Sequence, residues 1–299
     1  MPSWQSYVVH PILRFTVKRK LAQATTALSA RVLFNNPLPP PKGARFSPDS
    51  VGGVTGEWAK SDNNGAGTLL YLHGGAYFAC SPQTHRPITG AYALRGLRVF
   101  APDYRLAPET PFPAAVDDAL AVYRAMLEHG PANAFAIGGD SAGGGLALAT
   151  LLAAKAAGLP MPACALLFSP WTDLAGTGAS VITNAKRDSM LYAPKLGDAA
   201  ANYLNGAAPQ NPLASPYYGD LAGLPPLLIQ VGEPEILLDD STRIAARAQE
   251  AGIVVDLSIW ENLPHVWQMN QSFLPEARQA LDQAANFAKA HLASRPNGA

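Results

Sequence analysis

The sequence predicts an α/β fold, in which helices cover both faces of a mostly parallel sheet. Apolar runs of strand length alternate with helix-length amphipathic stretches from residue 68 to residue 293. Such alternation is the pattern of parallel strands joined by crossover helices. Hydrophobic residues make up 48% of the 299 residues, which is enough for a large core.

The alternation assigns each element in turn. Strands are expected at residues 68–72, 97–101, 135–137, 163–168, 227–231 and 253–259. Helices are expected at residues 89–96, 113–128, 145–157, 239–251 and 275–293. The second of these is the clearest, because apolar residues recur at steps of four, three and four from Val116 to Leu127 and Pro113 suits a first helical turn.

Two stretches do not follow the alternation, and we predict that they form a cap. Residues 1–42 end in a proline-rich connector, and residues 175–211 mix small polar residues with apolar and aromatic ones. The chain is therefore divided into an N-terminal cap segment (1–42), a first part of the core (43–174), a cap insertion (175–211) and a second part of the core (212–299).

Composition and charge exclude several classes of function. The 22 Lys and Arg balance 22 Asp and Glu, whereas a nucleic-acid-binding protein needs a basic face. The balance also gives no reason to expect an anionic membrane surface as a partner. Cys80 and Cys164 are too few for a disulfide framework. Neither an export signal nor a stable membrane span stands out, so a cytoplasmic protein is expected.

The most informative motif is Gly139-Asp140-Ser141-Ala142-Gly143, which lies between a predicted strand and a predicted helix. It fits G-x-S-x-G, the nucleophile elbow, in the strand–turn–helix context that this motif requires. So sharp a reversal leaves no room for bulky flanking side chains, and it exposes the serine hydroxyl above the sheet. The motif predicts Ser141 as a nucleophile; the alternative is an ordinary glycine-rich turn.

A second glycine motif, His73-Gly74-Gly75-Ala76, follows the strand at 68–72. Backbone N–H groups that point into a cleft stabilise an oxyanion without reorganisation, and glycines allow the close approach that this needs. We expect an oxyanion hole formed by the N–H groups of Gly74 and Gly75, with Ala142 as the third donor.

A serine nucleophile needs a base, and His265 is the best placed of six histidines. It follows the last predicted strand, at the edge of the sheet where α/β proteins bind ligands. The other five lie in the N-terminal segment, near helix ends or around the glycine loop: His10, His73, His85, His129 and His291.

The acid that orients the base should follow the strand at 227–231. Glu233, Glu235 and the pair Asp239/Asp240 compete for this role. Carboxylates that begin a helix need no catalytic explanation. The residues favour Glu235, with Asp239 second.

Several motifs together resemble one family. Beyond the serine and glycine motifs, the resemblance rests on Asp103-Tyr104-Arg105-Leu106-Ala107-Pro108-Glu109, Ser169-Pro170-Trp171, Leu237-Leu238-Asp239-Asp240 and His265-Val266. From Thr68 to Ala293 the chain resembles the hormone-sensitive-lipase-like α/β-hydrolases, bacterial carboxylesterases also called the α/β-hydrolase fold-3 family. The resemblance implies an α/β-hydrolase fold with a helical cap.

The resemblance also selects the acid, because the family's acid precedes its histidine by about thirty residues, as Glu235 does. The chain departs from the family at three positions. Ala76 stands where many relatives have a third glycine, the acid is Glu rather than the usual Asp, and Pro234 occupies a position that is often acidic.

The expected activity is hydrolysis of short- to medium-chain acyl esters, without a metal or organic cofactor. The substrate is a small-molecule ester. The candidate contacts are aromatic and apolar residues near the motifs or in the cap: Tyr77, Trp171, Met190, Tyr192 and Trp267. The alternative for each of them is packing in the core, which is about as common for such residues as substrate contact. Relatives often pair through their last strand, which points to a homodimer edge at residues 253–259. The alternatives are a lactonase, amidase or formamidase with the same machinery, and a non-catalytic receptor on the same scaffold, which retention of His265 disfavours.

Overall fold

The protein folds around one eight-stranded sheet, described here from a computed structural model that covers residues 1–63 and 65–292. The strand order is β1-β2-β4-β3-β5-β6-β7-β8. The six strands from β3 onward in the chain run parallel. They are β3 (Gly67–Leu72), β4 (Leu97–Pro102), β5 (Phe135–Asp140), β6 (Ala165–Phe168), β7 (Leu227–Gly232) and β8 (Val255–Trp260).

An antiparallel hairpin at one edge was not predicted from the sequence. It consists of β1 (Arg45–Val51) and β2 (Val54–Lys60), and β2 pairs antiparallel with β4. The outer strand is mostly exposed and contains Pro48, a residue that sheets tolerate at their edges. Such a strand has no long apolar run, so hydrophobic patterning did not indicate it.

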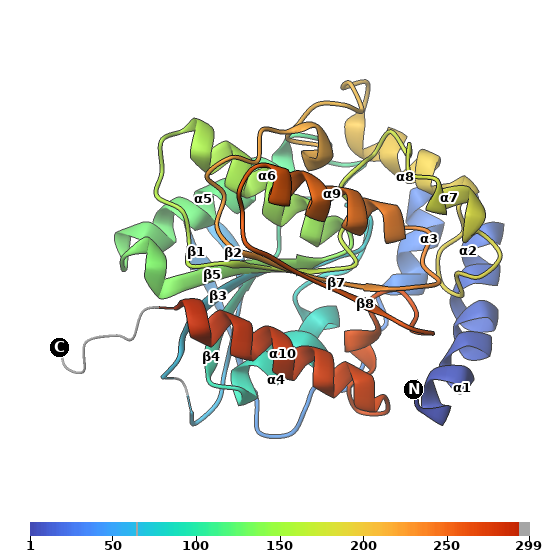
Figure 1. Ribbon diagram of the computed structural model, residues 1–299, viewed down its shortest axis with the longest axis horizontal. Coiled ribbons are helices and arrows are strands. Elements are labelled where there is room, and N and C mark those ends of the chain that lie inside the picture. The colour runs from blue at the N-terminus through green and yellow to red at the C-terminus, as the bar shows by residue number, and fades with distance from the viewer. Residues whose placement is uncertain (64, 293–299) are drawn as a thin grey trace.

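Helices cover both faces of the sheet, as predicted (Figure 1). Three pack on one face: α5 (Ala114–Glu128), α6 (Ala142–Ala156) and α9 (Leu238–Glu250). The opposite face carries α4 (Arg86–Leu94) and α10 (Pro275–His291). Two helices begin three residues earlier than expected, α4 at Arg86 and α6 at Ala142. Ala293, the last residue of the predicted final helix, lies outside the described residues.

Alternate residues of the five inner parallel strands, β3 to β7, fill two separate cores. Leu70 and Leu72 of β3 face the core under α5, α6 and α9, whereas Leu69 and Tyr71 face the core under α4 and α10. All four side chains are fully buried. Burial on both faces is typical of parallel sheets and explains why these strands are continuous apolar runs.

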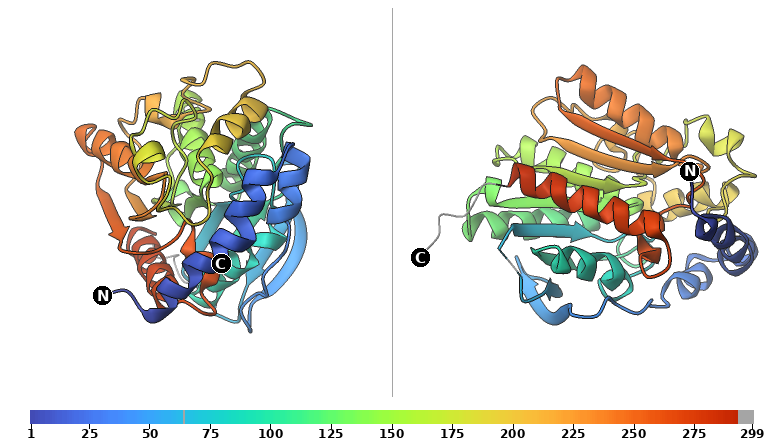
Figure 2. Two further views of the ribbon diagram at one scale, coloured as in Figure 1. Left: turned by 90° about the vertical axis from the view of Figure 1, so that its right-hand side faces the viewer. Right: turned by 60° about the horizontal axis from the view of Figure 1, so that its bottom comes forward.

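The two segments outside the alternation are largely helical and lie at the same end of the molecule (Figures 1 and 2). Residues 1–42 form α1 (Trp4–Leu13), a π-helical turn (Arg14–Lys18), α2 (Arg19–Gln23) and α3 (Ala27–Phe34). Residues 175–211 contain α7 (Ser180–Thr183) and α8 (Pro194–Leu204). Within the described ranges, no helix has both the length and the hydrophobicity of a membrane-spanning segment.

Candidate active site

Ser141 occupies a sharp turn between β5 and α6, in the position that the motif predicts. Its backbone has φ +52° and ψ −123°, a strained conformation for a residue with a side chain. Two backbone hydrogen bonds hold it there, because the Ser141 N–H donates to the Phe168 carbonyl at 2.8 Å and its carbonyl accepts from the Trp171 N–H at 2.8 Å. The hydroxyl is therefore fixed at the carboxyl end of the sheet.

The glycines of the motif are required by close backbone packing around this turn. A Cβ on Gly143 would lie 2.1 Å from the Leu72 carbonyl oxygen, and a Cβ on Gly139 would lie 2.4 Å from the Gly143 carbonyl oxygen. Backbone atoms cannot move away as a flexible side chain can. Only glycine fits at these two positions without displacing the strand end.

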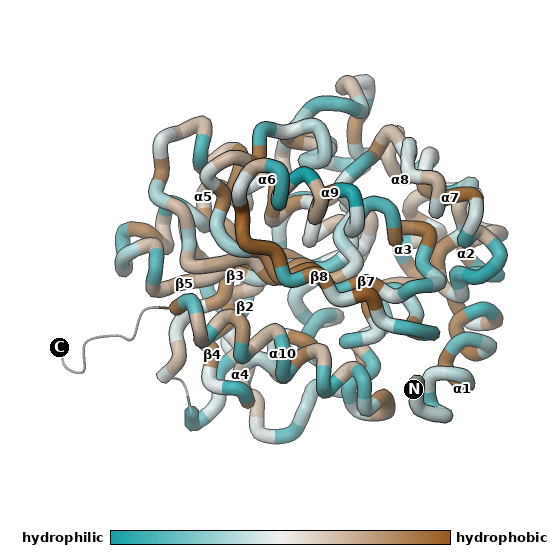
Figure 3. Tube along the Cα trace, viewed as in Figure 1, coloured by the Kyte–Doolittle hydropathy of each residue, from teal (hydrophilic) through white to brown (hydrophobic). Residues whose placement is uncertain are grey.

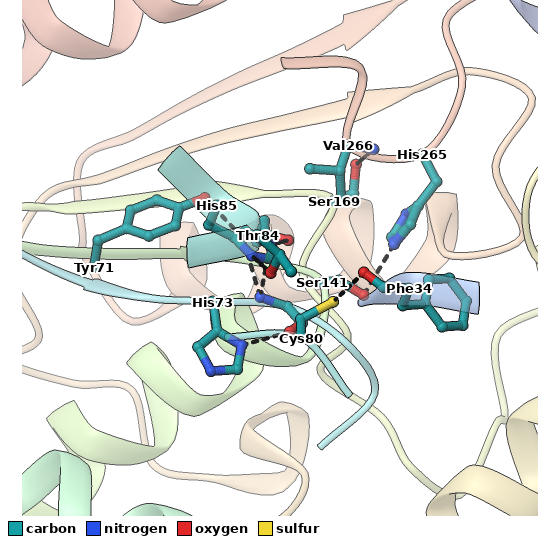
Figure 4. Close-up of polar contacts among 12 residues, drawn as sticks. Phe34, Tyr71, His73, Cys80, Thr84, His85, Ser141, Ser169, His265 and Val266 are labelled. Carbon is teal, nitrogen blue, oxygen red and sulfur yellow. Dashed lines mark hydrogen bonds and ion pairs between the residues drawn. The ribbon is translucent and has the colours of Figure 1, made fainter. Parts of the chain in front are cut away.

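Three side chains from distant parts of the sequence form one hydrogen-bonded chain. His265 Nε2 lies 2.9 Å from Ser141 Oγ, and its Nδ1 lies 2.6 Å from Glu235 Oε2. His265 is 3% exposed and Glu235 is fully buried. Figure 4 shows the imidazole directed at the hydroxyl. The arrangement matches the geometry of a nucleophile, a base and an orienting acid.

The buried pair changes the basicity of the imidazole. Burial disfavours the charged ring and lowers the pKa of His265, but the facing Glu235 carboxylate outweighs burial, so the pKa lies above its usual value of 6.5. A base with a raised pKa accepts a proton from a hydroxyl more readily.

The carboxylates that competed with Glu235 are engaged elsewhere. Glu233 pairs with Arg187, and Asp239 accepts the Ser180 N–H at 3.0 Å. Asp240 accepts the backbone N–H groups of Thr172 and Asp173 at 2.7 and 2.9 Å. Of the four candidates, Glu235 is the one in contact with His265.

Two polar residues that sequence reasoning did not assign hold Glu235 in place. Ser169 Oγ donates to Glu235 Oε1 at 2.7 Å. It also accepts the Val266 N–H at 3.3 Å (Figure 4), so it connects the acid to the loop that carries the base. Asp188 Oδ2 accepts the Ile236 N–H at 3.0 Å, next to the acid. Ser169 belongs to a motif of the resemblance and was detectable, whereas the irregular segment around Asp188 carried no signal.

The glycine loop lies beside the serine, but one expected oxyanion donor is not free. The Gly74 N–H donates to Asp140 Oδ1 at 3.1 Å, so the expectation that it belongs to the oxyanion hole is wrong. Within the described part of the chain, the N–H groups of Gly75 and Ala76 have no acceptor. Ala142 is the first residue of α6, where the N–H has no partner within the helix. Gly75, Ala76 and Ala142 are thus the available donors.

Asp140 connects the glycine loop to the nucleophile. Its buried carboxylate accepts a hydrogen bond from the Tyr71 hydroxyl at 2.8 Å and lies 3.2 Å from His85 Nε2, in addition to the contact with Gly74. Burial raises the pKa of Asp140, but the contacts with His85 and Tyr71 outweigh burial and lower it below its usual value. This network holds the glycine loop next to Ser141.

A cavity of about 580 Å³ lies between the two helical segments and the glycine loop. Its wall includes Ala76 and Phe78 of that loop, residues of α2 and α3, and residues around α8. The lining is mainly apolar, and its polar members are Thr25, Thr26, Lys195, Asp198 and Asn202. A site of this size accommodates a small organic molecule.

The five predicted substrate contacts lie in different surroundings. Tyr192 lines the cavity. Tyr77 is 1% exposed and stacks on Tyr203, and Trp171 is 2% exposed near Tyr77. Met190 is partly buried and not among the lining residues. Trp267 is fully buried in a separate apolar cluster with Trp260, so packing rather than substrate contact explains it.

Comparison with known proteins agrees with the fold and the motifs. Residues 69–269 match a family model described as alpha/beta hydrolase fold. An acetyl-hydrolase of Streptomyces hygroscopicus is 48% identical over 240 residues, 80% of each chain. An esterase of Acinetobacter venetianus is 36% identical over 296 residues, 95% of this chain and 96% of the relative.

Solved structures include close matches over nearly the whole chain. An esterase from the bacterial hormone-sensitive lipase family superposes with a TM-score of 0.92 at 41% identity, covering 98% of this chain and 100% of the other. The esterase EstE5, in a crystal soaked with p-nitrophenyl butyrate, gives a TM-score of 0.93 at 38% identity, covering 97% and 99%. Among the described residues, no group of three or more His, Cys, Asp and Glu is arranged to hold a metal ion.

Proposed function

Because the chain belongs to the hormone-sensitive-lipase-like bacterial esterases of the α/β-hydrolase family and is a carboxylic ester hydrolase, we propose that it cleaves short- to medium-chain acyl esters through an acyl-enzyme on Ser141. The observation that carries this proposal is the hydrogen-bonded chain from the Ser141 hydroxyl through His265 to Glu235. A serine alone is a weak nucleophile, and a neighbouring oriented base activates it.

In the proposed mechanism His265 Nε2 takes the proton from Ser141 Oγ as the oxygen attacks the ester carbonyl carbon. The imidazolium then gives this proton to the departing alcohol, and the acyl group stays on Ser141. A water molecule then attacks the acyl carbon while His265 accepts its proton. The bond between this carbon and Ser141 Oγ breaks, the imidazolium returns the proton to Oγ, and the carboxylic acid product leaves. Glu235 keeps the Nδ1 proton in place and stabilises the imidazolium, so it acts on the base and not on the substrate.

The developing oxyanion is stabilised by the N–H groups of Gly75, Ala76 and Ala142. Support for this set is that the first two have no acceptor among the described residues and that the third begins α6. The positive end of the α6 dipole favours negative charge at the same place. Ala76 adopts φ +52°, a left-handed conformation that favours glycine, so the alanine here carries backbone strain where many relatives have glycine.

Residues 1–42 and 175–211 act as a cap that encloses the substrate. Support comes from the cavity, whose wall combines α2 and α3 of the first segment with α8 of the second and with Ala76 of the glycine loop. The apolar wall suits the hydrocarbon part of an ester, and Tyr192 is the predicted contact that lies in it.

Replacing the nucleophile tests the mechanism directly. Ser141→Ala should lower kcat for p-nitrophenyl butyrate by about 10⁴-fold or more, because the remaining groups cannot form an acyl-enzyme. The thermal unfolding midpoint should stay close to that of the parent protein. Stoichiometric labelling by an organophosphate, located at residue 141 by mass spectrometry, should be lost in the variant. Undiminished turnover would refute the acyl-enzyme.

A matched pair of substitutions tests the acid. Glu235→Gln should reduce kcat/KM by about 10³-fold or more, because a neutral amide neither stabilises the imidazolium nor fixes the tautomer. Asp239→Asn removes a carboxylate of the same loop region that contacts Ser180 instead. It should change kcat/KM by less than about tenfold. The reverse order of effects would transfer the role to Asp239.

The raised pKa of His265 predicts how activity depends on pH. The imidazole must be neutral to accept the serine proton, so kcat/KM should fall as the pH decreases through an inflection above 6.5. Without the opposing carboxylate, burial dominates and the inflection should move to lower pH in Glu235→Gln. A profile whose inflection does not move in that variant would contradict the coupling of these two residues.

The β8 edge is proposed to join two copies of the chain. Support is that β8 ends the strand order and exposes apolar side chains, with Val254 just before it 66% exposed and Ile259 within it 49% exposed (Figure 3). Sedimentation equilibrium should show a dimer, and Ile259→Lys should shift it towards monomer. A parent protein that is monomeric at every concentration would contradict this edge pairing.

A further inference from the structure

The outward face of the N-terminal helix is apolar, which is the reverse of an ordinary surface helix. Trp4, Tyr7, Val8, Ile12 and Phe15 are 66%, 60%, 39%, 51% and 69% exposed. Trp4, Val8 and Ile12 follow one another at steps of four residues in α1 and therefore share one face, and Phe15 follows them in the π-helical turn. We call these five residues the N-terminal stripe. Figure 2, left, faces this end of the molecule, where α1 lies at the surface.

The inward face of the same helix is held by Val9, which is buried in the apolar cluster around Trp267, and by polar contacts. Ser3 Oγ donates to Glu276 at 2.9 Å, and the Asn262 side-chain amide donates to Ser6 Oγ at 3.0 Å. His10 lies 2.9 Å from Ser189 Oγ and 3.1 Å from the Asn262 carbonyl oxygen. The helix is thus attached without burying its stripe, and packing against the core does not explain those apolar side chains.

Cations flank the stripe, and no acidic residue accompanies them. Residues 1–42 contain six of the 22 Lys and Arg and none of the 22 Asp and Glu. Four of the six follow α1 within two turns. Arg14 and Lys18 donate to backbone carbonyls at residues 185–188. Arg19 and Lys20 are exposed and form no ion pair in the described part of the chain.

The neutral net charge of the whole chain conceals this asymmetry. Because the total is zero, residues 43–299 carry an excess of six acidic residues. The net charge of the whole chain gave no reason to expect an anionic membrane surface as a partner. The charge of residues 1–42 alone does give such a reason. Arg19 also lies over the Phe15 ring at 5.1 Å, so apolar and cationic groups are contiguous.

We propose that the N-terminal stripe and its flanking cations dock on an anionic lipid surface. An apolar face with Trp and Phe, bordered by Lys and Arg, is the composition of helices that lie in the interface of a bilayer. A second copy of the chain fits less well, because a symmetric pairing of this face would bring two segments of six excess cations together.

Docking places the cavity beside the lipid. Leu21, Ala24 and Leu28, on the turns that follow the stripe, line the cavity. Leu28 is 54% exposed, so the apolar surface continues from the stripe to the cavity wall. Esters that partition into the lipid surface would thereby be concentrated near the proposed site. The docking itself does not depend on the catalytic mechanism.

The proposal is tested by co-sedimentation with vesicles. The parent protein should sediment with vesicles of phosphatidylcholine and phosphatidylglycerol at low salt and remain in solution with pure phosphatidylcholine. Removing apolar area (Trp4→Ser with Phe15→Ser) or charge (Arg19→Gln with Lys20→Gln) should each lower the partition coefficient by about tenfold. The control Arg124→Gln with Lys289→Gln removes two exposed cations elsewhere and should leave binding unchanged.

All variants should retain the parent rate on a water-soluble short-chain ester, which shows that they are folded. Three outcomes would overturn the proposal. The first is no binding of the parent protein to anionic vesicles. The second is equal loss of binding in the charge control. The third is a concentration-dependent dimer that the Trp4→Ser, Phe15→Ser variant alone abolishes, because it would assign the stripe to a second copy of the chain.

Discussion

The contact between the buried Glu235 carboxylate and the His265 imidazole is the interaction on which the site depends. A carboxylate without a partner in this fully buried position would be strongly unfavourable, so the loop after β7 requires donors around it. The imidazole, Ser169 and the Gly232 N–H supply them. The same contact raises the basicity of the ring that faces Ser141. The contact with His265 thus both stabilises the buried Glu235 carboxylate and prepares the imidazole to activate the Ser141 hydroxyl.

The parallel sheet brings the three residues together. Ser141 follows β5, Glu235 follows β7 and His265 follows β8, and all three strands end at the same edge. Asp140 adds the glycine loop, because its carboxylate accepts the Gly74 N–H while its backbone continues into Ser141. The loop is therefore positioned by the residue that precedes the nucleophile. A substitution that displaces the glycine loop should therefore also displace the turn that carries Ser141.

The two helical segments outside the sheet combine two properties that follow from their composition. Their inner sides contribute to an apolar cavity beside the glycine loop. The outer side of α1 is apolar and is followed by Arg19 and Lys20, which are exposed and form no ion pair within the described part of the chain. An ester hydrolase with such a surface would meet its substrates where they accumulate, at the boundary between water and lipid.

Local patterns in the sequence were sufficient to predict the parallel strands, most of the helices and the turn that carries Ser141, because buried strands are continuous apolar runs and G-x-S-x-G requires a specific turn. The catalytic roles of Ser141 and His265 stay predictions. Local patterns were insufficient wherever a residue's conformation or hydrogen bond is determined by a contact with a distant part of the chain. The first turn of α6 contains three glycines, which favour a later helix start. They are required because Leu72, Pro170 and Trp171 closely approach residues 143, 144 and 145, respectively. Likewise, Gly74 appeared to be a free donor until Asp140 was placed beside it. Only the tertiary structure decided which surfaces meet. It determined that Trp267 is buried, which partners the competing carboxylates have, and that the N-terminal stripe is exposed.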